Sequence, residues 1–291
     1  MLESYIVLST YYKEEPMIIT ETRQRDKIAV IGMDNRQKEL VRELKLRFQP
    51  SSVIHAKTPE DLKTAAGVIV LPVKASEELF NDIGWMDQLE PDTLLLAGLA
   101  GEMLREACGK RQLKLISYLD NTEFKIANAV PTSEGAIKLY MELSGQTVAQ
   151  SRMLVLGFGH CGKALSIRLK ALGADVTVFA RSPEDRIYGK TLGVDMREYK
   201  QLPKLVRQKA CIFNTVPERL LDGSILTYMP RSNLIIDLAS APGGTDFSLC
   251  EKMKLTAVLA SSLPGKFFPK TAGKILADTV AAIINDQKED E

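Results

Sequence analysis

The segment MLVLGFGHCGKAL, which begins at residue 153, constrains the fold more than any other part of the chain. An apolar strand runs into a GxGxxG pattern, and a helical pattern follows it, which is the order that a dinucleotide-binding unit requires. The pattern consists of Gly157, Phe158, Gly159, His160, Cys161 and Gly162. In such a unit the glycines permit a tight turn, close approach of a pyrophosphate and packing of the helix on the strand. The free N–H groups of the helix N-terminus then bind the phosphates. The alternative is that the glycines form only a tight turn.

The residues after the next strand indicate which dinucleotide is bound. About 20 residues past the last glycine, an NAD-binding unit commonly places an acid that bonds the adenosine ribose. This chain has Arg181 followed by Ser182 after the strand DVTVF. An arginine and a hydroxyl can hold a 2′-phosphate through charge-assisted hydrogen bonds. We therefore expect NADP, with NAD as the alternative if Arg181 is only a solvated residue or stacks on adenine.

Strand-like and helical segments alternate on both sides of this motif, which is typical of parallel sheets with helical crossovers. In the first half the expected strands are 27–32, 53–55, 67–73, 92–99 and 113–119, with helices at 34–48, around Glu77 and at 101–110. In the second half the expected strands begin near residues 152, 175, 210, 233 and 256. We predict an α/β protein of two Rossmann-like, doubly wound lobes with the active site in the cleft between them.

The expected organisation has an N-terminal extension at 1–25, a substrate lobe at 26–130 and a cofactor domain at 131–270. A linking helix is expected at 131–144, because Pro131 precedes Thr132 and Ser133, either of which can cap a helix, and Glu134 would then lie in the first turn. A C-terminal helix at 271–286 is expected to pack back on the first lobe.

Composition and charge exclude several classes of function. The formal net charge is +1 and the basic residues are scattered, so the sequence shows no concentrated nucleic-acid-binding surface. No apolar run approaches the roughly 20 residues of a membrane span, and the first residues do not resemble a signal peptide, so a cytoplasmic protein is expected. The four cysteines lack paired spacing, so neither a metal site nor a disulfide framework is expected.

The chain has only two histidines, His55 and His160. A 2-hydroxy-acid dehydrogenase normally uses a histidine or lysine base beside the hydride acceptor. His160 falls inside the phosphate loop, away from the nicotinamide end, and His55 is expected at a surface or core edge. The usual hydroxy-acid mechanism is therefore not favoured.

Six segments follow one another in a characteristic order: IGMDNRQ from Ile31, NAVPTSEGAIKL from Asn128, VLGFGHCGKAL from Val155, FNTVP from Phe213, IIDLASAPGGTDF from Ile235 and LPGKFFPKTAGKIL from Leu263. In this combination the chain resembles the family of the dipicolinate synthase A subunit over about Lys27 to Ile284. The last of these segments is also similar to alanine dehydrogenase and the transhydrogenases, and the lobes look like those of 2-hydroxy-acid dehydrogenases and S-adenosylhomocysteine hydrolase.

The resemblance implies oxidation of dihydrodipicolinate to dipicolinate with NADP+ during sporulation, together with a flavoprotein-like B subunit of dipicolinate synthase. Homo-oligomers are common among two-lobe dehydrogenases, and one is expected here. Two alternatives are another two-lobe NAD(P)-dependent dehydrogenase of an amino or keto acid, and a cofactor-binding regulatory subunit.

The resemblance also implies a set of site residues. Near the nicotinamide these are Asn214, Thr215 and Pro217, in a segment that could instead be only a capped turn. For the substrate carboxylates they are Asp34, Arg36, Thr132, Ser133, Ser240, Gly243, Gly244, Lys270 and Thr271. For the proton they are Asp237 or Glu134, with water as the alternative.

Several of these assignments have a purely structural alternative. Gly243 and Gly244 could expose N–H groups as an anion-binding nest or only form a tight connection. Arg36 could clamp a carboxylate or belong to a charge cluster at a helix N-terminus, and Glu134 could be a capping-box partner. Two positions depart from the family pattern. Met33 replaces an expected glycine, and Ala241 stands where a basic residue is expected.

Overall fold

The computed structural model describes residues 26–62, 64–73, 84–208 and 210–289. The chain forms two compact units. Unit 1 comprises the described residues up to Met33 together with Val41–Ile116, and unit 2 comprises Asp34–Leu40 and the described residues from Ser117 onward. The expected extension at 1–25 and the helix around Glu77 lie outside the described residues. The cleft between the lobes stays a prediction.

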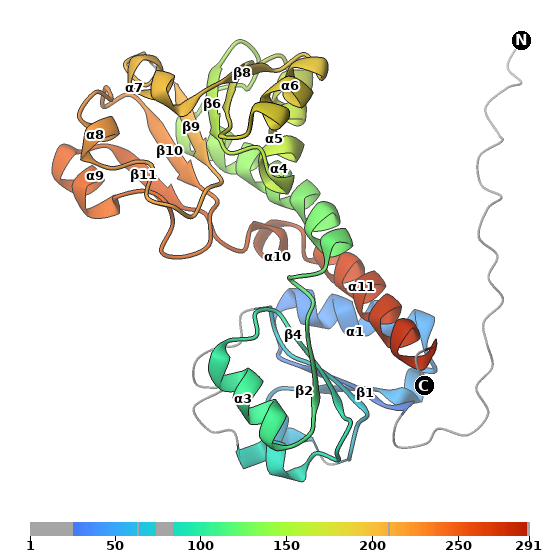
Figure 1. The fold of residues 1–291 in the computed structure, drawn as a ribbon. Coiled ribbons are helices and arrows are strands. Elements are labelled where there is room, and N and C mark those ends of the chain that lie inside the picture. The colour runs from blue at the N-terminus through green and yellow to red at the C-terminus, as the bar shows by residue number, and fades with distance from the viewer. Residues whose placement is uncertain (1–25, 63, 74–83, 209, 290–291) are drawn as a thin grey trace, which may run out of the picture. The chain divides into compact units, whose positions relative to one another are not determined.

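Unit 1 is built on a five-stranded sheet with the order β2-β1-β3-β4-β5, as in doubly wound folds (Figure 1). Its elements are β1 (Ile28–Ile31), α1 (Asn35–Arg47), β2 (Val53–Ala56), β3 (Val68–Val70), β4 (Leu94–Ala97), α3 (Glu102–Lys110) and β5 (Lys114–Ser117). The first residues of α1 are grouped with unit 2. Strand β1 pairs in parallel with β2 and β3, and β3 pairs in parallel with β4. All five strands expected in this half are confirmed.

The strands of unit 1 are apolar because the sheet is buried, as parallel sheets usually are. Every residue of β1, β3 and β4 is buried. One face packs against α3, where Leu104, Ala107 and Cys108 join a core with Trp85 and Met86. A parallel sheet of this kind places the carboxyl ends of its strands along one edge, where ligands bind in doubly wound folds.

Unit 2 has a six-stranded sheet with the order β11-β10-β9-β6-β7-β8 (Figure 1). All of its strand pairs are parallel. Its elements are α4 (Thr122–Ser144), β6 (Arg152–Leu156), α5 (His160–Ala171), β7 (Asp175–Phe179), α6 (Pro183–Thr191), β8 (Asp195–Arg197), α7 (Leu202–Leu205), β9 (Cys211–Asn214), α8 (Gly223–Leu226), β10 (Leu234–Asp237), α9 (Phe247–Met253), β11 (Thr256–Leu259), α10 (Leu263–Phe267) and α11 (Pro269–Glu289). The strand order of this sheet is that of the dinucleotide-binding Rossmann fold.

Helices cover both faces of the second sheet, and alternation along β6 shows why. Successive strand residues point to opposite faces. Met153 and Val155 pack in a core with residues of α4 and α5, whereas Leu154 and Leu156 pack in a core with residues of α7, α8 and α9. Figure 1 shows these two groups of helices on opposite sides of the strands. The order of the strands reverses between β6 and β9, and the loops after these two strands define the crevice where ligands bind in such sheets.

Helix α4 begins at Thr122, nine residues before the expected start at residue 131, so the helix prediction is wrong at this end. The side chain of Asn121 caps it by accepting a hydrogen bond from the N–H of Phe124 at 2.8 Å. Pro131 lies inside the helix and is buried. A proline normally breaks a helix, but packing of a buried face can override that tendency. The spacing of residues in the sequence could not show that side chains before Pro131 are buried by tertiary packing.

The C-terminal helix α11 is longer than the expected 271–286 at both ends. Its residue Gly273 lies against α1: a Cβ added there would meet the Cβ of Glu39 at 2.6 Å and the N of Leu40 at 2.9 Å. The glycine therefore allows the two helices to approach closely within unit 2. In the part of the chain that the structure describes, α11 and the other helices all lack the combination of length and apolar character needed to span a membrane.

Leu154 supplies a direct test of the core of unit 2. It is fully buried, and truncation to alanine should lower the free energy of unfolding by about 3 kcal/mol through lost burial and a residual cavity. The control Leu172→Ala, at a residue that is 49% exposed, should lower it by less than about 0.5 kcal/mol. Urea unfolding followed by circular dichroism measures both. Equal effects of the two substitutions would contradict the assigned core.

Candidate functional site

The phosphate loop joins β6 to α5, and two of its glycines are required by the protein itself. Gly157 has a φ of +99°, and a Cβ there would lie 2.3 Å from Oγ1 of Thr215. A Cβ on Gly162 would lie 2.2 Å from the carbonyl oxygen of Gly157. These two positions therefore accept only glycine for reasons of conformation and space.

Gly159 differs from the other two glycines of the motif. It caps α5, its φ is −72°, and a Cβ there would meet no atom of the described chain within 4 Å. The protein therefore leaves open space over this residue, at the N-terminus of a 12-residue helix whose first turn has no acidic residue. A helix N-terminus with open space in front of it is a binding site for phosphate. His160 begins this helix and is exposed, whereas the ring of Phe158 is buried.

The loop after β9 lies directly beside the phosphate loop. The hydroxyl of Thr215 donates to the carbonyl of Leu156 at 2.8 Å, and its N–H donates to the same oxygen at 2.9 Å. The Asn214 side chain closes a turn with Val216, donating to its carbonyl at 2.9 Å and accepting from its N–H at 3.1 Å. The capped turn that sequence left open for this segment is present. Its position at the reversal of strand order also makes it a wall of the expected cofactor crevice.

The loop after β10 does contain an anion-binding nest, but the anion belongs to the chain. The carboxylate of Asp237 accepts hydrogen bonds from the N–H of Ala239 at 3.0 Å, the N–H of Gly244 at 2.9 Å and the hydroxyl of Thr245 at 2.6 Å. The N–H of Gly243 donates to the carbonyl of Ser240 at 2.8 Å. The expectation that the two glycine N–H groups face a substrate carboxylate is therefore wrong.

These contacts favour a structural role for Asp237. Its side chain is fully buried and accepts three hydrogen bonds, so the carboxylate holds the loop in shape. Gly244 adds to the same junction, because a Cβ there would lie 2.4 Å from the carbonyl oxygen of Val216 and 2.5 Å from that of Glu218. The loops after β9 and β10 are thus packed backbone to backbone.

Arg181 and Ser182, which follow β7, both contact carboxylates of the chain. Nη1 of Arg181 lies 3.2 Å and 3.3 Å from the two carboxylate oxygens of Glu218. Ser182 caps α6 by accepting from the N–H of Asp185 at 3.2 Å, and its hydroxyl donates to Glu184 at 2.5 Å. Glu218 was not among the expected site residues. Its only signal in the sequence is that it directly follows Pro217 of the FNTVP segment.

Tyr199 also borders this region and was not expected there. Its ring packs on Phe179, with ring centroids 6.0 Å apart, and burial is the main cause that raises the pKa of its hydroxyl to about 12. Arg181 and Glu218 both act electrostatically on that hydroxyl, which places Tyr199 beside their ion pair. At neutral pH the phenol is therefore an uncharged donor at the edge of the crevice.

Residues of α4 that were expected at a helix N-terminus lie inside the helix. The hydroxyl of Thr132 donates to the carbonyl of Asn128 at 2.7 Å, and that of Ser133 donates to the carbonyl of Val130 at 2.7 Å. The carboxylate of Glu134 accepts from Nε of Arg168 on α5 at 3.3 Å. The anion site and the capping role predicted for these residues from a helix start at 132 are therefore wrong.

Among the described charged residues, Arg36 is the one whose surroundings most favour the binding of an anion. It is 7% exposed, and burial lowers its pKa, while Tyr118 and Asp34 act in the opposite direction. Within the described residues no carboxylate lies at ion-pair distance from its guanidinium. A buried charge without a close counter-ion is strongly unfavourable, so a carboxylate ligand would relieve a real desolvation penalty.

One other of the sequence segments of the family resemblance lies against Arg36. Gly265, in the segment that begins at Leu263, lies against its guanidinium, because a Cβ there would be 2.9 Å from Nη2. Asp34 is exposed and accepts a hydrogen bond from the N–H of Gln37 at 2.9 Å, which caps the start of α1. Lys270 and Thr271 are exposed in the first turn of α11, as the sequence predicted for the start of this helix.

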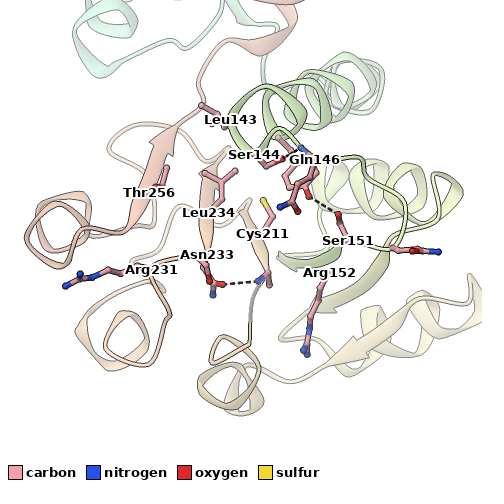
Figure 2. A pocket seen from close by; sticks show the side chains of 14 residues that line it. Leu143, Ser144, Gln146, Ser151, Arg152, Cys211, Arg231, Asn233, Leu234 and Thr256 are labelled. Atoms are coloured by element: carbon pink, nitrogen blue, oxygen red, sulfur yellow. Dashed lines mark hydrogen bonds between the residues drawn. The ribbon is translucent and has the colours of Figure 1, made fainter.

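A separate hollow of about 530 Å³ opens at the amino edge of the second sheet (Figure 2). It is lined by the starts of the strands, including Arg152 and Cys211, and by the end of α4. Figure 2 shows the side chains of Arg152 and Arg231 pointing in different directions rather than toward a common point. None of the expected site residues lines it. No group of three His, Cys, Asp or Glu side chains that could hold a metal ion occurs among the described residues.

Comparison with known families agrees with this geometry. A family model described as "D-isomer specific 2-hydroxyacid dehydrogenase, NAD binding domain" matches residues 125–258. The match covers the phosphate loop and the strands on both sides of it. The fold and the site therefore define an oxidoreductase that uses a nicotinamide dinucleotide and is built on two Rossmann-like lobes.

Relatives over the whole length define the family more closely. The chain is 30% identical to the A subunit of dipicolinate synthase of Bacillus subtilis (strain 168), over 91% of this chain and 98% of that protein. A crystal structure of the A subunit of dipicolinate synthase from Bacillus halodurans has a TM-score of 0.81 at 26% identity, covering 89% of this chain and 97% of that one. The corresponding crystal structure from Bacillus subtilis has a TM-score of 0.80 at 29% identity, covering 91% and 97%. The chain belongs to the family of the dipicolinate synthase A subunit.

Alanine substitution should have opposite effects at two glycines of the loop, Gly157 and Gly159. Gly157→Ala should destabilise the protein, because the residue has a positive φ and its Cβ would overlap Thr215. Gly159→Ala should lower the melting temperature by no more than a few degrees, the cost of a poorer helix cap, and weaken binding of the coenzyme at least about tenfold, because only a ligand occupies that space. Thermal melts and fluorescence titration with NADPH and NADH measure both effects.

Gly109→Ala is the matched control, since a Cβ there also meets nothing within 4 Å and the residue lies on α3 in unit 1. It should change neither the melting temperature by more than a few degrees nor the affinity. Unchanged coenzyme affinity in Gly159→Ala would show that no pyrophosphate lies over the loop.

Proposed function

We propose that the chain oxidises dihydrodipicolinate to dipicolinate with NADP+ as hydride acceptor and acts together with a B subunit of dipicolinate synthase. Membership of the family and the whole-length similarity to proteins named as the A subunit of that enzyme support this activity. The observation that carries the substrate class is the buried guanidinium of Arg36, which lacks a carboxylate partner among the described residues. A dicarboxylate substrate supplies that partner.

The described residues fit a nicotinamide dinucleotide. Open space over Gly159 and the uncapped N-terminus of α5 suit the pyrophosphate, and the loop at Asn214 and Thr215 lines the crevice beside it. Arg181 and Ser182 are proposed to hold the 2′-phosphate at the adenosine end. When bound, this cofactor supplies the acceptor for the hydride.

The side chains of the protein have little catalytic chemistry left to perform once the cofactor accepts the hydride. Dihydrodipicolinate loses one hydride to the cofactor and one proton, and the ring becomes aromatic, so the product side is strongly favoured. Arg36 binds and orients a carboxylate, which lowers the entropic part of the barrier. The carboxylate of Asp237 already accepts three hydrogen bonds, and that of Glu134 is paired with Arg168, so we propose that water accepts the proton.

Arg36→Gln tests the substrate assignment. Loss of a charge-assisted carboxylate contact should lower kcat/KM for dihydrodipicolinate about 10- to 100-fold, mainly through KM. NADPH affinity should not change, and the protein should not lose stability, because an unpaired buried charge is removed. The control Arg42→Gln, on the same helix with a side chain that is 61% exposed, should leave kcat/KM within about twofold.

Turnover by the purified chain tests the activity itself. Dihydrodipicolinate and NADP+ should yield dipicolinate and NADPH in equal amounts, at a higher kcat/KM than with NAD+. Adding the B subunit from Bacillus subtilis shows whether a partner is required. If no dipicolinate forms with or without that partner, while an amino or keto acid substrate is turned over, the proposed reaction is excluded in favour of another dehydrogenase.

A further inference from the structure

The two groups assigned to the 2′-phosphate already carry carboxylates from the chain itself. Arg181 lies two residues past β7 and binds Glu218, which comes from the loop after β9, 37 residues further along the chain. Both Glu218 oxygens lie within 3.3 Å of the same guanidinium nitrogen. The side chains are 73% and 59% exposed, so the pair is open to a ligand.

The hydroxyl of Ser182 is likewise already bonded to a carboxylate of the chain. Its hydroxyl donates to Glu184 at 2.5 Å, and this hydrogen bond is the main cause that lowers the pKa of Glu184. The carboxylate is therefore ionised at neutral pH. A serine hydroxyl has one proton to donate, so it cannot donate to Glu184 and to a phosphate oxygen at the same time.

Arg186, on α6, acts on Glu184 only as the smallest of the causes that lower the pKa of that carboxyl. Arg186 donates to the carbonyl oxygens of Ala180 and Arg181 at 3.0 Å and 2.6 Å, and its other nitrogen lies 3.6 Å from Glu198. Its guanidinium therefore holds the backbone of the loop and has its own counter-ion. Arg181 thus contacts the carboxylate of Glu218, and Ser182 contacts that of Glu184, at the place expected for the 2′-phosphate, which carries nearly two negative charges at neutral pH.

We propose that Glu218, assisted by Glu184, is a specificity-determining acid that competes with the 2′-phosphate for Arg181. This inference rests on the proposed function, in which Arg181 binds the adenosine end of the cofactor. A 2′-phosphate must either displace Glu218 from Nη1 of Arg181 or bind the remaining N–H groups of the guanidinium close to the charge of Glu218. NAD(H) has no phosphate at this position and meets no such competition. Glu218 therefore holds the preference for NADP(H) well below the value that Arg181 alone would give.

Glu218→Gln tests the inference directly. Removal of the charge should tighten NADPH binding about fivefold or more, because the competitor and the repulsion are both lost. NADH binding should stay within about twofold. The gain for NADPH should shrink at about 0.5 M salt, because exposed charges are screened. Fluorescence titration of each coenzyme gives the two dissociation constants, and circular dichroism confirms that the variant is folded.

Two further variants locate the effect. The control Glu251→Gln, at an exposed residue of α9, should leave both dissociation constants unchanged. In an Arg181→Gln background, Glu218→Gln should give a smaller gain for NADPH than it gives alone, because the acid then has no arginine to occupy.

The outcomes separate this inference from the proposed function. If wild type binds neither coenzyme, the proposed function fails. If wild type binds NADPH and Glu218→Gln leaves that affinity unchanged, the inference fails alone. If the variant instead loses NADH affinity at constant NADPH affinity, Glu218 is a ligand of the ribose hydroxyls, which also overturns the proposed competition.

Discussion

The structure of the candidate site depends on the close approach of three strand ends, those of β6, β7 and β9. The N–H of Gly157 donates to the carbonyl of Phe179 at 2.9 Å, while the hydroxyl and N–H of Thr215 both donate to Leu156. The carboxyl ends of β6, β7 and β9 are thereby joined at a point where a side chain on Gly157 would not fit. The strand order reverses at this point, which is where dinucleotides bind in such sheets. The shape of this crevice is therefore determined by backbone atoms rather than by long side chains.

The same principle extends across the rest of the sheet edge. Asp237 binds the loop that follows it through three hydrogen bonds, and Gly244 brings that loop against the carbonyl of Val216. Each loop is held by its neighbour, so the edge is preorganised before any ligand arrives.

The two arginines of the candidate site differ in how their charges are paired. The exposed Arg181 is already paired with Glu218, whereas the buried Arg36 has no carboxylate at ion-pair distance among the described residues. We propose that the first arrangement tunes cofactor affinity and that the second binds a substrate carboxylate.

Local sequence signals predicted the strands, the phosphate loop and the family, because a buried parallel strand and a glycine turn are each written in consecutive residues. They failed where a distant contact decides the outcome. Helix α4 continues through Pro131 because it buries one face, with Phe124 and Ala129 before the proline, and the nest at Gly244 binds Asp237 because the chain folds back on itself. The pairing of Arg181 with Glu218 joins residues from two loops, and no spacing in the sequence indicates it. Assignments that needed only adjacency were therefore the safest, and those that needed a free N–H group or a free charge were not.

Hydrogen–deuterium exchange with and without NADPH tests most directly whether a dinucleotide lies across this crevice. The coenzyme should slow exchange in peptides that cover residues 153–165 and 211–218, because its pyrophosphate binds the N–H groups at the start of α5 and its remaining groups cover the adjoining loop. Peptides from the amino edge, around residues 146–151 and 231–234, should be unaffected. Protection confined to that amino edge, or no protection at saturating coenzyme, would contradict the account.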